Sequence, residues 1–498
     1  MTARSGQVAL LRILTLSLVA LLGWNVWRLL AFSRIGIPFP YQFDYGEGIV
    51  WQQMRDMVHG TAYGPLHAFP AIVYHYPPVY HLTSAALAAL AGMDGLAAGR
   101  TVSLVSTLVT AIFAAWVASD AMMGRVERRV RLACGALAGL FFLNCYPVMM
   151  WAPLMRVDMI SGAFGLLGLW LAARAIDRPG LIYGAGVAFT LSVFAKQISV
   201  AAPFAAFLVL LVAHPKLAFK GLATCFTLGI PALAVLGFMT DGGFLRHIFL
   251  YNINRFDLSA LDEALLPLKF QPIAFFILAI AGAYQAWKIV RPPRGTGEVF
   301  RALRIHWAQD RATTLLAMLF VFLLVKTVML LGMAKSGSNY NYLIEWLSAV
   351  AIFAALALRN AVSAVMGETT AYRPLMLLAL AGLVAQGWYL PFRQDTREML
   401  ADRAALRAPI VERIARSPKP VISDEMTLLI RAGQDVRWEP AIAAELAHSG
   451  LYDEAAFVRM IRAHRFGFFV TEGDYGNKIF KQRYNPAVAA AMRAGDGL

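Results

Sequence analysis

The chain has 498 residues, of which 59% are hydrophobic and only 15% charged, and its formal net charge is +15. Soluble globular proteins have about 25% charged residues, so the composition excludes a cytosolic enzyme of two or three domains and indicates a membrane protein with several spans. The three cysteines, Cys134, Cys145 and Cys225, lie in apolar stretches. They offer neither a disulfide framework nor a cysteine metal site, and we interpret them as small core residues.

Eleven apolar runs are candidate membrane helices, judged against a hydrocarbon core about 30 Å thick. They lie at 8–32, 98–123, 132–150, 160–176, 181–195, 200–213, 219–239, 271–290, 312–334, 341–358 and 374–391. The segment 78–92 is shorter and follows Pro77 and Pro78. We interpret it as a re-entrant or surface-lying helix, because an additional span there would reverse the loop charges that follow.

The basic residues are concentrated in alternate loops, as in the cluster Arg125, Arg128, Arg129 and Arg131. Lys and Arg stay on the cytoplasmic side of membrane proteins, so the pattern predicts a cytoplasmic N-terminus and, with eleven spans, an outer C-terminus. In a bacterial cell this is a multi-pass protein of the inner membrane. A nucleic-acid partner is not expected, because the charge does not gather on one folded face.

The chain divides near residue 393 into two predicted domains. Residues 1–393 form a transmembrane domain whose first outer loop, 33–97, carries juxtamembrane helices. Residues 394–498 contain 15 Lys/Arg and 14 Asp/Glu, a density typical of a soluble domain. We predict a small α/β domain on the outer, periplasmic face. Its expected elements are strands at 419–423 and 466–473 and helices at 400–416 and 453–465.

Polar residues from six distant segments are predicted to meet at the outer rim of the membrane. They are Asp44, Glu47, His75, Tyr76, Arg156, Asp158, Lys196, Gln197, Arg255, Asn339 and Tyr340. Asp44 lies between Phe43 and Tyr45 beside the membrane, where an unpaired carboxylate is costly, and this favours a functional role.

Several of these residues have a structural alternative that stays open. Glu47 could complete a capping box that begins at Asp44, and Arg156 could pair with Asp158 to end a helix. Lys196 could extend to the interface as helix-end lysines do, and Lys326 is costly within its span unless it faces a cavity or the interface. The histidines form no convincing zinc pattern, so no metal ligand is assigned.

Such a set suits a substrate with a lipid tail and an anionic head. Arg and Lys bind phosphate, Arg in bidentate fashion. A carboxylate within hydrogen-bond reach can take the proton of an attacking hydroxyl, while cations stabilise the departing phosphate. Transfer of a sugar from a lipid phosphate requires these parts.

The motifs DYGEG (44–48), YPPVYHL (76–82) and AKQ (195–197), with the outer C-terminal domain, resemble the GT-C superfamily of integral-membrane glycosyltransferases that use polyprenyl-phosphate sugars. The nearest likeness is to bacterial relatives of protein O-mannosyltransferases and to the aminoarabinose and galacturonic acid transferases that modify lipid A. The likeness in layout covers nearly the whole chain, and its motifs are short.

The resemblance implies that Asp44 is the catalytic base and that Glu47 occupies the neighbouring acidic position. Tyr76 with the two prolines after it would shape the floor of the site, and Lys196 and Arg255 would hold the donor phosphate. In protein O-mannosyltransferases the Asp and Glu are adjacent, whereas two residues separate them here. The metal requirement varies in the superfamily, which leaves a divalent cation as an open cofactor.

We therefore predict an inverting transferase of a hexosyl or pentosyl group from a polyprenyl-phosphate donor to a glycan, lipid or protein acceptor. Asp44 is the proposed base, Arg156, Lys196 and Arg255 hold phosphate, and Asn339 and Tyr340 line the pocket. The alternatives are a transporter or flippase of lipid-linked sugars, an oligosaccharide polymerase or ligase that uses diphosphate-linked donors, and a scaffold.

Overall fold

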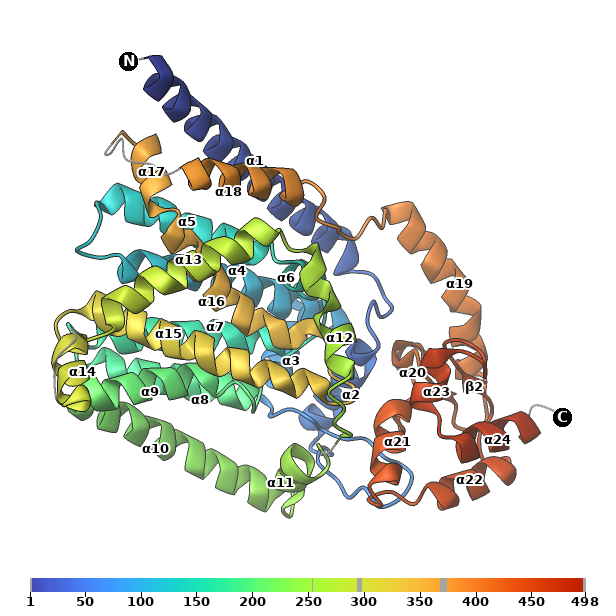
Figure 1. The fold of residues 1–498 in the computed structure, drawn as a ribbon. Coiled ribbons are helices and arrows are strands. Elements are labelled where there is room, and N and C mark those ends of the chain that lie inside the picture. The colour runs from blue at the N-terminus through green and yellow to red at the C-terminus, as the bar shows by residue number, and fades with distance from the viewer. Residues whose placement is uncertain (1, 253, 293–297, 368–373, 496–498) are drawn as a thin grey trace.

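The computed structural model describes residues 2–252, 254–292, 298–367 and 374–495. A large helical bundle contains most of the chain, and a smaller group of helices formed by the C-terminal residues lies at one end of it (Figure 1).

Each of the eleven predicted spans contains a helix. These helices are α1 (Thr2–Gly36), α4 (Gly95–Ala121), α5 (Arg128–Leu143), α7 (Asp158–Arg174), α8 (Leu181–Ala195), α9 (Ala201–Ala213), α10 (Pro215–Met239), α13 (Ile273–Val290), α15 (Arg311–Met329), α16 (Leu343–Ala357) and α18 (Pro374–Gly387). Six helical segments, which include α1, α4, α10, α13, α15 and α16, are long and apolar enough to cross a membrane. The other five helices have 13 to 17 residues. A multi-pass membrane protein follows, whereas eleven full spans stay a prediction.

The predicted span 132–150 is divided in the structure. Helix α5 ends at Leu143, and the short helix α6 (Tyr146–Trp151) follows. Asn144 turns its side-chain amide back to the carbonyl oxygens of Leu22 and Leu140, at 3.1 and 2.8 Å. The ring of Pro147 in the first turn of α6 is compatible with a helix start but not with a helix interior, so the chain breaks there and redirects α6 toward the site.

The first outer loop contains two helices, α2 (Gly46–His59) and α3 (Val79–Ala91). Helix α3 buries Tyr80, His81 and Ser84 and exposes Leu82 and Leu90. Its 13 residues extend for about 20 Å at 1.5 Å per residue, which is too short to cross a hydrocarbon core of about 30 Å.

Shorter helical elements connect the long ones. They are α11 (Gly243–Leu245), the π-helix η1 (Arg246–Leu250), α12 (Ala260–Leu265), η2 (Leu266–Phe270), α14 (Val299–Trp307), η3 (Leu330–Ala334), η4 (Tyr340–Tyr342) and α17 (Arg359–Val365).

The C-terminal residues form a domain that is more helical than predicted. Its elements are α19 (Arg397–Ala415), β1 (Ile422–Ser423), α20 (Met426–Arg431), α21 (Pro440–His448), α22 (Glu454–Arg462), β2 (Phe469–Val470), α23 (Lys478–Arg483) and α24 (Pro486–Gly495). The two predicted strands are reduced to two residues each, paired in parallel with Ile422 opposite Phe469. A pair this short contributes little, so the domain rests on its aromatic core, where Trp438 stacks on Phe457 with ring centroids 4.3 Å apart.

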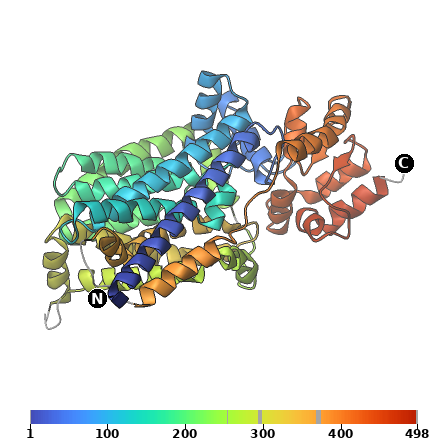
Figure 2. The same cartoon turned by 90° about the horizontal axis from the view of Figure 1, so that it is seen from above.

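This C-terminal domain contacts the first outer loop directly (Figure 2). The backbone N–H of Gln42 donates to Thr427 Oγ1 at 3.2 Å, and that of Ala71 donates to the carbonyl of Arg437 at 2.8 Å. A Cβ at Gly48 would come within 2.7 Å of Met426 Cβ. Glycine therefore lets α2 approach α20 closely.

Candidate active site

Asp44 lies immediately before α2 and pairs with Arg156, which lies in the loop between α6 and α7. Its Oδ1 atom accepts hydrogen bonds from the Arg156 guanidinium and from the backbone N–H of Gly46, the latter at 3.0 Å. Oδ2 has no hydrogen-bond partner among the described residues, and 18% of the side chain is exposed. The carboxylate is thus held by one oxygen while the other is free to act.

Glycine at position 46 makes this pairing possible. The Arg156 guanidinium occupies the space that a Cβ at Gly46 would need. The same guanidinium lies over the Trp151 ring, with its Cζ 5.1 Å from the ring centroid. The Arg156 guanidinium is therefore held between the Trp151 ring, the backbone of Gly46 and the Asp44 carboxylate.

Glu47 lies beneath the pair and has no exposed surface. Both its oxygens bind Arg100 of α4, at 2.8 and 2.9 Å. It also accepts the N–H of Phe43 at 2.7 Å and that of Met155 at 2.8 Å. Burial alone would raise the pKa of Glu47, but Arg100 and these donors outweigh it and hold that pKa below its usual value.

The two N–H groups bound by Glu47 belong to the residues that precede Asp44 and Arg156. One buried carboxylate therefore aligns the two loops that bring the acid and its guanidinium together. With no free oxygen and no exposed surface, Glu47 fits a positioning role in this arrangement.

Asp158 forms a second centre beside the first. Its Oδ1 accepts Lys196 Nζ at 2.5 Å and Asn341 Nδ2 at 2.8 Å, and its Oδ2 accepts Trp151 Nε1 at 2.7 Å. Lys196 also lies 4.9 Å from the centroid of the Tyr342 ring. Asp158 thus pairs with Lys196, and Arg156 with Asp44, so the open alternative in which Arg156 pairs with Asp158 is not what the structure has.

The loop that carries His75 and Tyr76 closes one side of this centre. Gln197 Nε2 donates to the backbone carbonyl of His75 at 2.7 Å, and Tyr63 donates to that of Tyr76 at 2.9 Å. The Tyr76 hydroxyl lies within electrostatic range of Asp158, and burial raises the pKa of Tyr76 to about 12. Burial lowers the pKa of His75 to about 3, so its imidazole is neutral.

Tyr340 and Arg393 close the opposite side. The Tyr340 ring lies 5.1 Å from that of Trp151, within electrostatic range of both Asp44 and Arg393. Arg393 lies over the Phe43 ring at 5.0 Å, and its Nε has no hydrogen-bond partner among the described residues. No carboxylate of the described chain pairs with it. Asn339 instead accepts the N–H of Tyr340 and begins η4.

Arg255 lies outside this group. It pairs with Glu445 of α21 at 2.8 Å, and 58% of its side chain is exposed. The predicted role at the donor phosphate is therefore not supported by its position. Arg255 instead connects the segment before α12 to the C-terminal domain.

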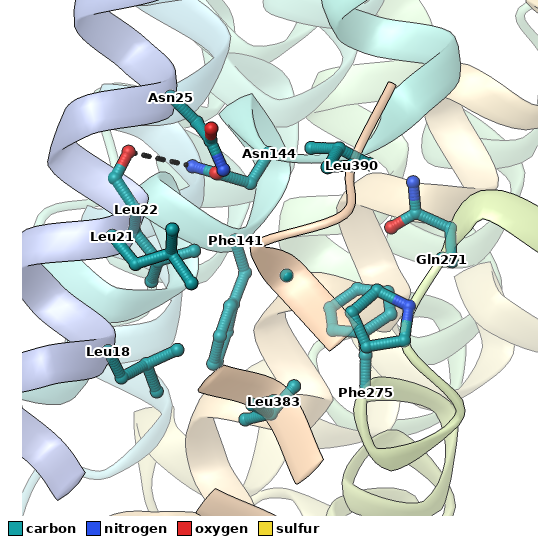
Figure 3. Close-up of a pocket in the computed structure, with 12 residues that line it drawn as sticks. Leu18, Leu21, Leu22, Asn25, Phe141, Asn144, Gln271, Phe275, Leu383 and Leu390 are labelled. Atoms are coloured by element: carbon teal, nitrogen blue, oxygen red, sulfur yellow. Dashed lines mark hydrogen bonds between the residues drawn. The ribbon is translucent and has the colours of Figure 1, made fainter. Parts of the chain in front are cut away.

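An apolar pocket between α1, α5, α13 and α18 lies near the site (Figure 3). It has a cavity volume of about 30 Å³ and is lined mainly by leucine and phenylalanine. Figure 3 shows Asn25, Asn144 and Gln271 at one end and Leu18 and Leu383 at the other. Asn144 Oδ1 and Gln271 Nε2 have no hydrogen-bond partner among the described residues.

Aromatic rings connect this polar end of the pocket with the acid centre. Tyr146 lies 4.7 Å from Phe270, the residue before Gln271, and 6.2 Å from Tyr340. Tyr340 lies within electrostatic range of the Asp44 carboxylate. Packed aromatic rings therefore lie between the pocket and the acid centre.

Four site residues carry little signal in the sequence. Trp151 and Asn341 resemble ordinary interfacial residues, Arg100 resembles a loop charge, and Arg393 resembles the flank of the last span. Only the excess polarity of the segment around Asn341 was informative. Within the described ranges, no group of three His, Cys, Asp or Glu side chains could hold a metal ion, so the open divalent cation has no ligand set in this part of the chain.

Comparison with known proteins yields matches among solved structures alone, since no family model and no curated protein matches the chain. ArnT from Cupriavidus metallidurans in the apo state aligns with a TM-score of 0.57 at 14% identity, covering 91% of this chain and 93% of that chain. The same protein bound to undecaprenyl phosphate aligns with a TM-score of 0.55 at 15% identity, covering 88% and 91%. The chain therefore shares the fold of ArnT over most of its length.

Proposed function

We propose that the chain is an inverting glycosyltransferase that transfers a sugar from a polyprenyl-phosphate donor to a glycan, lipid or protein acceptor at the outer face of the membrane. The observation that carries the proposal is the free Oδ2 of Asp44 beside Arg156, within electrostatic range of Tyr340. Support also comes from the fold, since one of the ArnT structures that share it is bound to undecaprenyl phosphate.

In the proposed reaction Asp44 acts as the base. Its free oxygen takes the proton of the acceptor hydroxyl while the acceptor oxygen attacks the anomeric carbon. The bond from that carbon to the phosphate oxygen breaks, and polyprenyl phosphate leaves with the electron pair. Arg156 holds the carboxylate in one orientation, so the oxygen that accepts the proton points to a fixed place.

Arg393 is our candidate for the donor phosphate. Arg156, Lys196 and Arg255 were the predicted phosphate ligands, yet each is paired with a carboxylate of the protein. Arg393 has none among the described residues, and a guanidinium binds phosphate in bidentate fashion. A phosphate there would lie near Tyr340, which is within electrostatic range of Arg393.

One assay with two variants separates these roles. Purified protein in nanodiscs is given a panel of radiolabelled polyprenyl-phosphate sugars, and transfer to water and to a bacterial envelope extract is measured. We expect Asp44→Asn to lower turnover by a factor of about 10²–10⁴ with donor affinity unchanged, because it removes a general base. Arg393→Ala should instead weaken donor binding and leave turnover at saturation closer to wild type.

Asp241→Asn is the matched control, since Asp241 is an exposed carboxylate on another outer loop. It should behave as wild type. Full activity of Asp44→Asn would refute the assignment of the base. A wild-type protein that neither binds nor uses any donor would refute the transferase and favour the transport alternative.

A further inference from the structure

The C-terminal domain places a carboxyl group next to the acid centre. Glu439 lies immediately before α21, and only 5% of its surface is exposed. The segment before it is anchored to the first outer loop, where the N–H of Val436 donates to Gln52 Oε1 at 3.1 Å and Trp438 forms a backbone bridge with Ala71. The position of Glu439 is therefore set by the same loop that carries Asp44.

The immediate surroundings of Glu439 belong to the site. The first cation that acts on its carboxyl is Arg156, the partner of Asp44. Tyr45, the residue after Asp44, accepts the N–H of Ala441 at 3.4 Å, two residues beyond Glu439. The segment that carries Asp44 and the segment that carries Glu439 are thus in direct hydrogen-bond contact.

Glu439 has no partner of its own in the described part of the chain. Its Oε2 is buried without a hydrogen bond, and no ion pair involves its side chain. This contrasts with Asp424 of the same domain, whose oxygens accept Tyr484 at 2.6 Å and Arg483 at 3.0 Å. A buried carboxyl that is left unpaired is costly to the fold and is retained where a ligand completes its hydrogen bonds.

The charges that face Glu439 come from several elements. Arg156 approaches from the loop before α7 and Arg483 from α23, with its Cζ 4.0 Å from the centroid of the Tyr45 ring. Arg483 is neutralised by Asp424 and Glu472, and Arg156 by Asp44. Burial dominates, and it raises the pKa of Glu439 to about 8, so at neutral pH the carboxyl is mostly protonated and can both donate and accept a hydrogen bond.

We propose that Glu439 binds the acceptor by a hydrogen bond to its reacting hydroxyl or to a neighbouring polar group, so that the C-terminal domain supplies part of the acceptor subsite. This inference rests on the proposed transferase function. It assigns the donor to the membrane domain and the acceptor to the junction of the two domains. Water needs no such subsite to attack the donor.

The test compares Glu439→Leu and Glu439→Gln with wild type in the nanodisc assay. In Glu439→Leu, transfer to the envelope extract should fall at least tenfold while hydrolysis of the donor by water is unchanged. Glu439→Gln keeps a neutral, hydrogen-bonding side chain and should retain most of the transfer. Glu412→Gln, a change of an exposed acid on α19, is the matched control and should match wild type.

Thermal unfolding in the same nanodiscs gives a measurement that does not need turnover. Glu439→Leu should unfold no earlier than wild type, because it removes an unpaired buried carboxyl, whereas a merely structural glutamate would lower the Tm when replaced. The extract should raise the Tm of wild type and not that of Glu439→Leu. The subsite would be overturned if the extract raised the Tm of both proteins equally or of neither. It would also be overturned if Glu439→Leu and wild type transferred sugar to the extract equally, even where both turn over the donor.

Discussion

At the scale of single residues, the partners of each acid separate the roles within the site. Asp44 keeps one oxygen free, whereas Glu47 and Asp158 have both oxygens bound. A general base needs a carboxylate oxygen that no other group already binds. A buried carboxylate whose two oxygens are both bound can only hold neighbouring groups in position. The residues that look alike in sequence therefore divide into one candidate base and two positioning groups.

Protonation of a buried histidine should control stability in acid. His247 has no exposed surface; its Nδ1 accepts the N–H of Tyr74 at 3.1 Å and its Nε2 donates to the carbonyl of Gly64 at 2.7 Å. The bond to Nδ1 needs the neutral ring, and burial lowers the pKa of His247 to about 4. The unfolded chain, with a histidine pKa near 6.5, binds a proton first as the pH falls.

His247 thus contributes stability that is present above pH 6.5 and is lost as the pH falls toward 4. We expect a loss of about 2 kcal/mol by pH 5, since one pKa unit corresponds to about 1.4 kcal/mol. Thermal unfolding of wild type and His247→Gln at pH 7.5, 6 and 5 checks this. The Tm of His247→Gln should be lower than that of wild type at pH 7.5 and should decline less steeply as the pH falls. The Tm of the exposed control His59→Gln should decline with the wild-type slope. Identical slopes would contradict the assignment.

At the scale of elements, polar side chains connect helices inside the bundle. Lys326 of α15 pairs with Glu345 of α16 at 3.1 Å. Ser199, just before α9, donates to Glu345 at 2.6 Å, and Ser161 of α7 donates to Ser199 at 2.6 Å. The costly lysine of the ninth predicted span is thus satisfied by a neighbouring helix and not by a cavity or the interface.

Breaking this pair should destabilise the bundle. Lys326→Met leaves Glu345 charged and unpaired, and removal of one partner of a buried pair costs about 3–5 kcal/mol. The double variant Lys326→Met with Glu345→Gln removes the charge and should recover most of the loss. Thermal unfolding in detergent measures both, with the exposed Lys288→Met as control. A double variant no more stable than the single one would argue against a paired charge as the cause.

At the scale of the whole molecule, a membrane bundle and a C-terminal domain share one site. The loop charges predict that the C-terminal domain lies outside the cell membrane and that α14 lies inside. This orientation decides from which side donor and acceptor arrive. It is independent of the identity of the sugar.

Cysteine labelling tests the orientation. Glu412→Cys on α19 and Arg301→Cys on α14 replace exposed side chains, while the native Cys134 and Cys145 are buried. A membrane-impermeant maleimide should label Glu412→Cys in intact spheroplasts and Arg301→Cys only after permeabilisation. The variant Cys225→Ala serves as the background, because Cys225 is partly exposed. The reverse labelling pattern would invert the topology.

Much of the helical framework could be predicted from the sequence, because long apolar runs have few alternatives in a membrane. The partners within the site could not, since pairing depends on how segments far apart in sequence approach. Arg156 and Arg255 were both expected at the donor phosphate, whereas Arg156 pairs with Asp44 and Arg255 pairs with Glu445. Glu439 was indistinguishable from the other charges of a soluble tail.

The docking of the C-terminal domain also determines when the site can exist. Tyr45 and Ala441, whose contact helps to close it, are 396 positions apart. Ribosomes add about 5–20 residues per second, so the first outer loop waits roughly 20–80 s before its partner emerges. During that interval the Tyr45 side of the acid centre lacks its contact with Ala441. A product truncated before residue 441 would therefore lack this contact permanently.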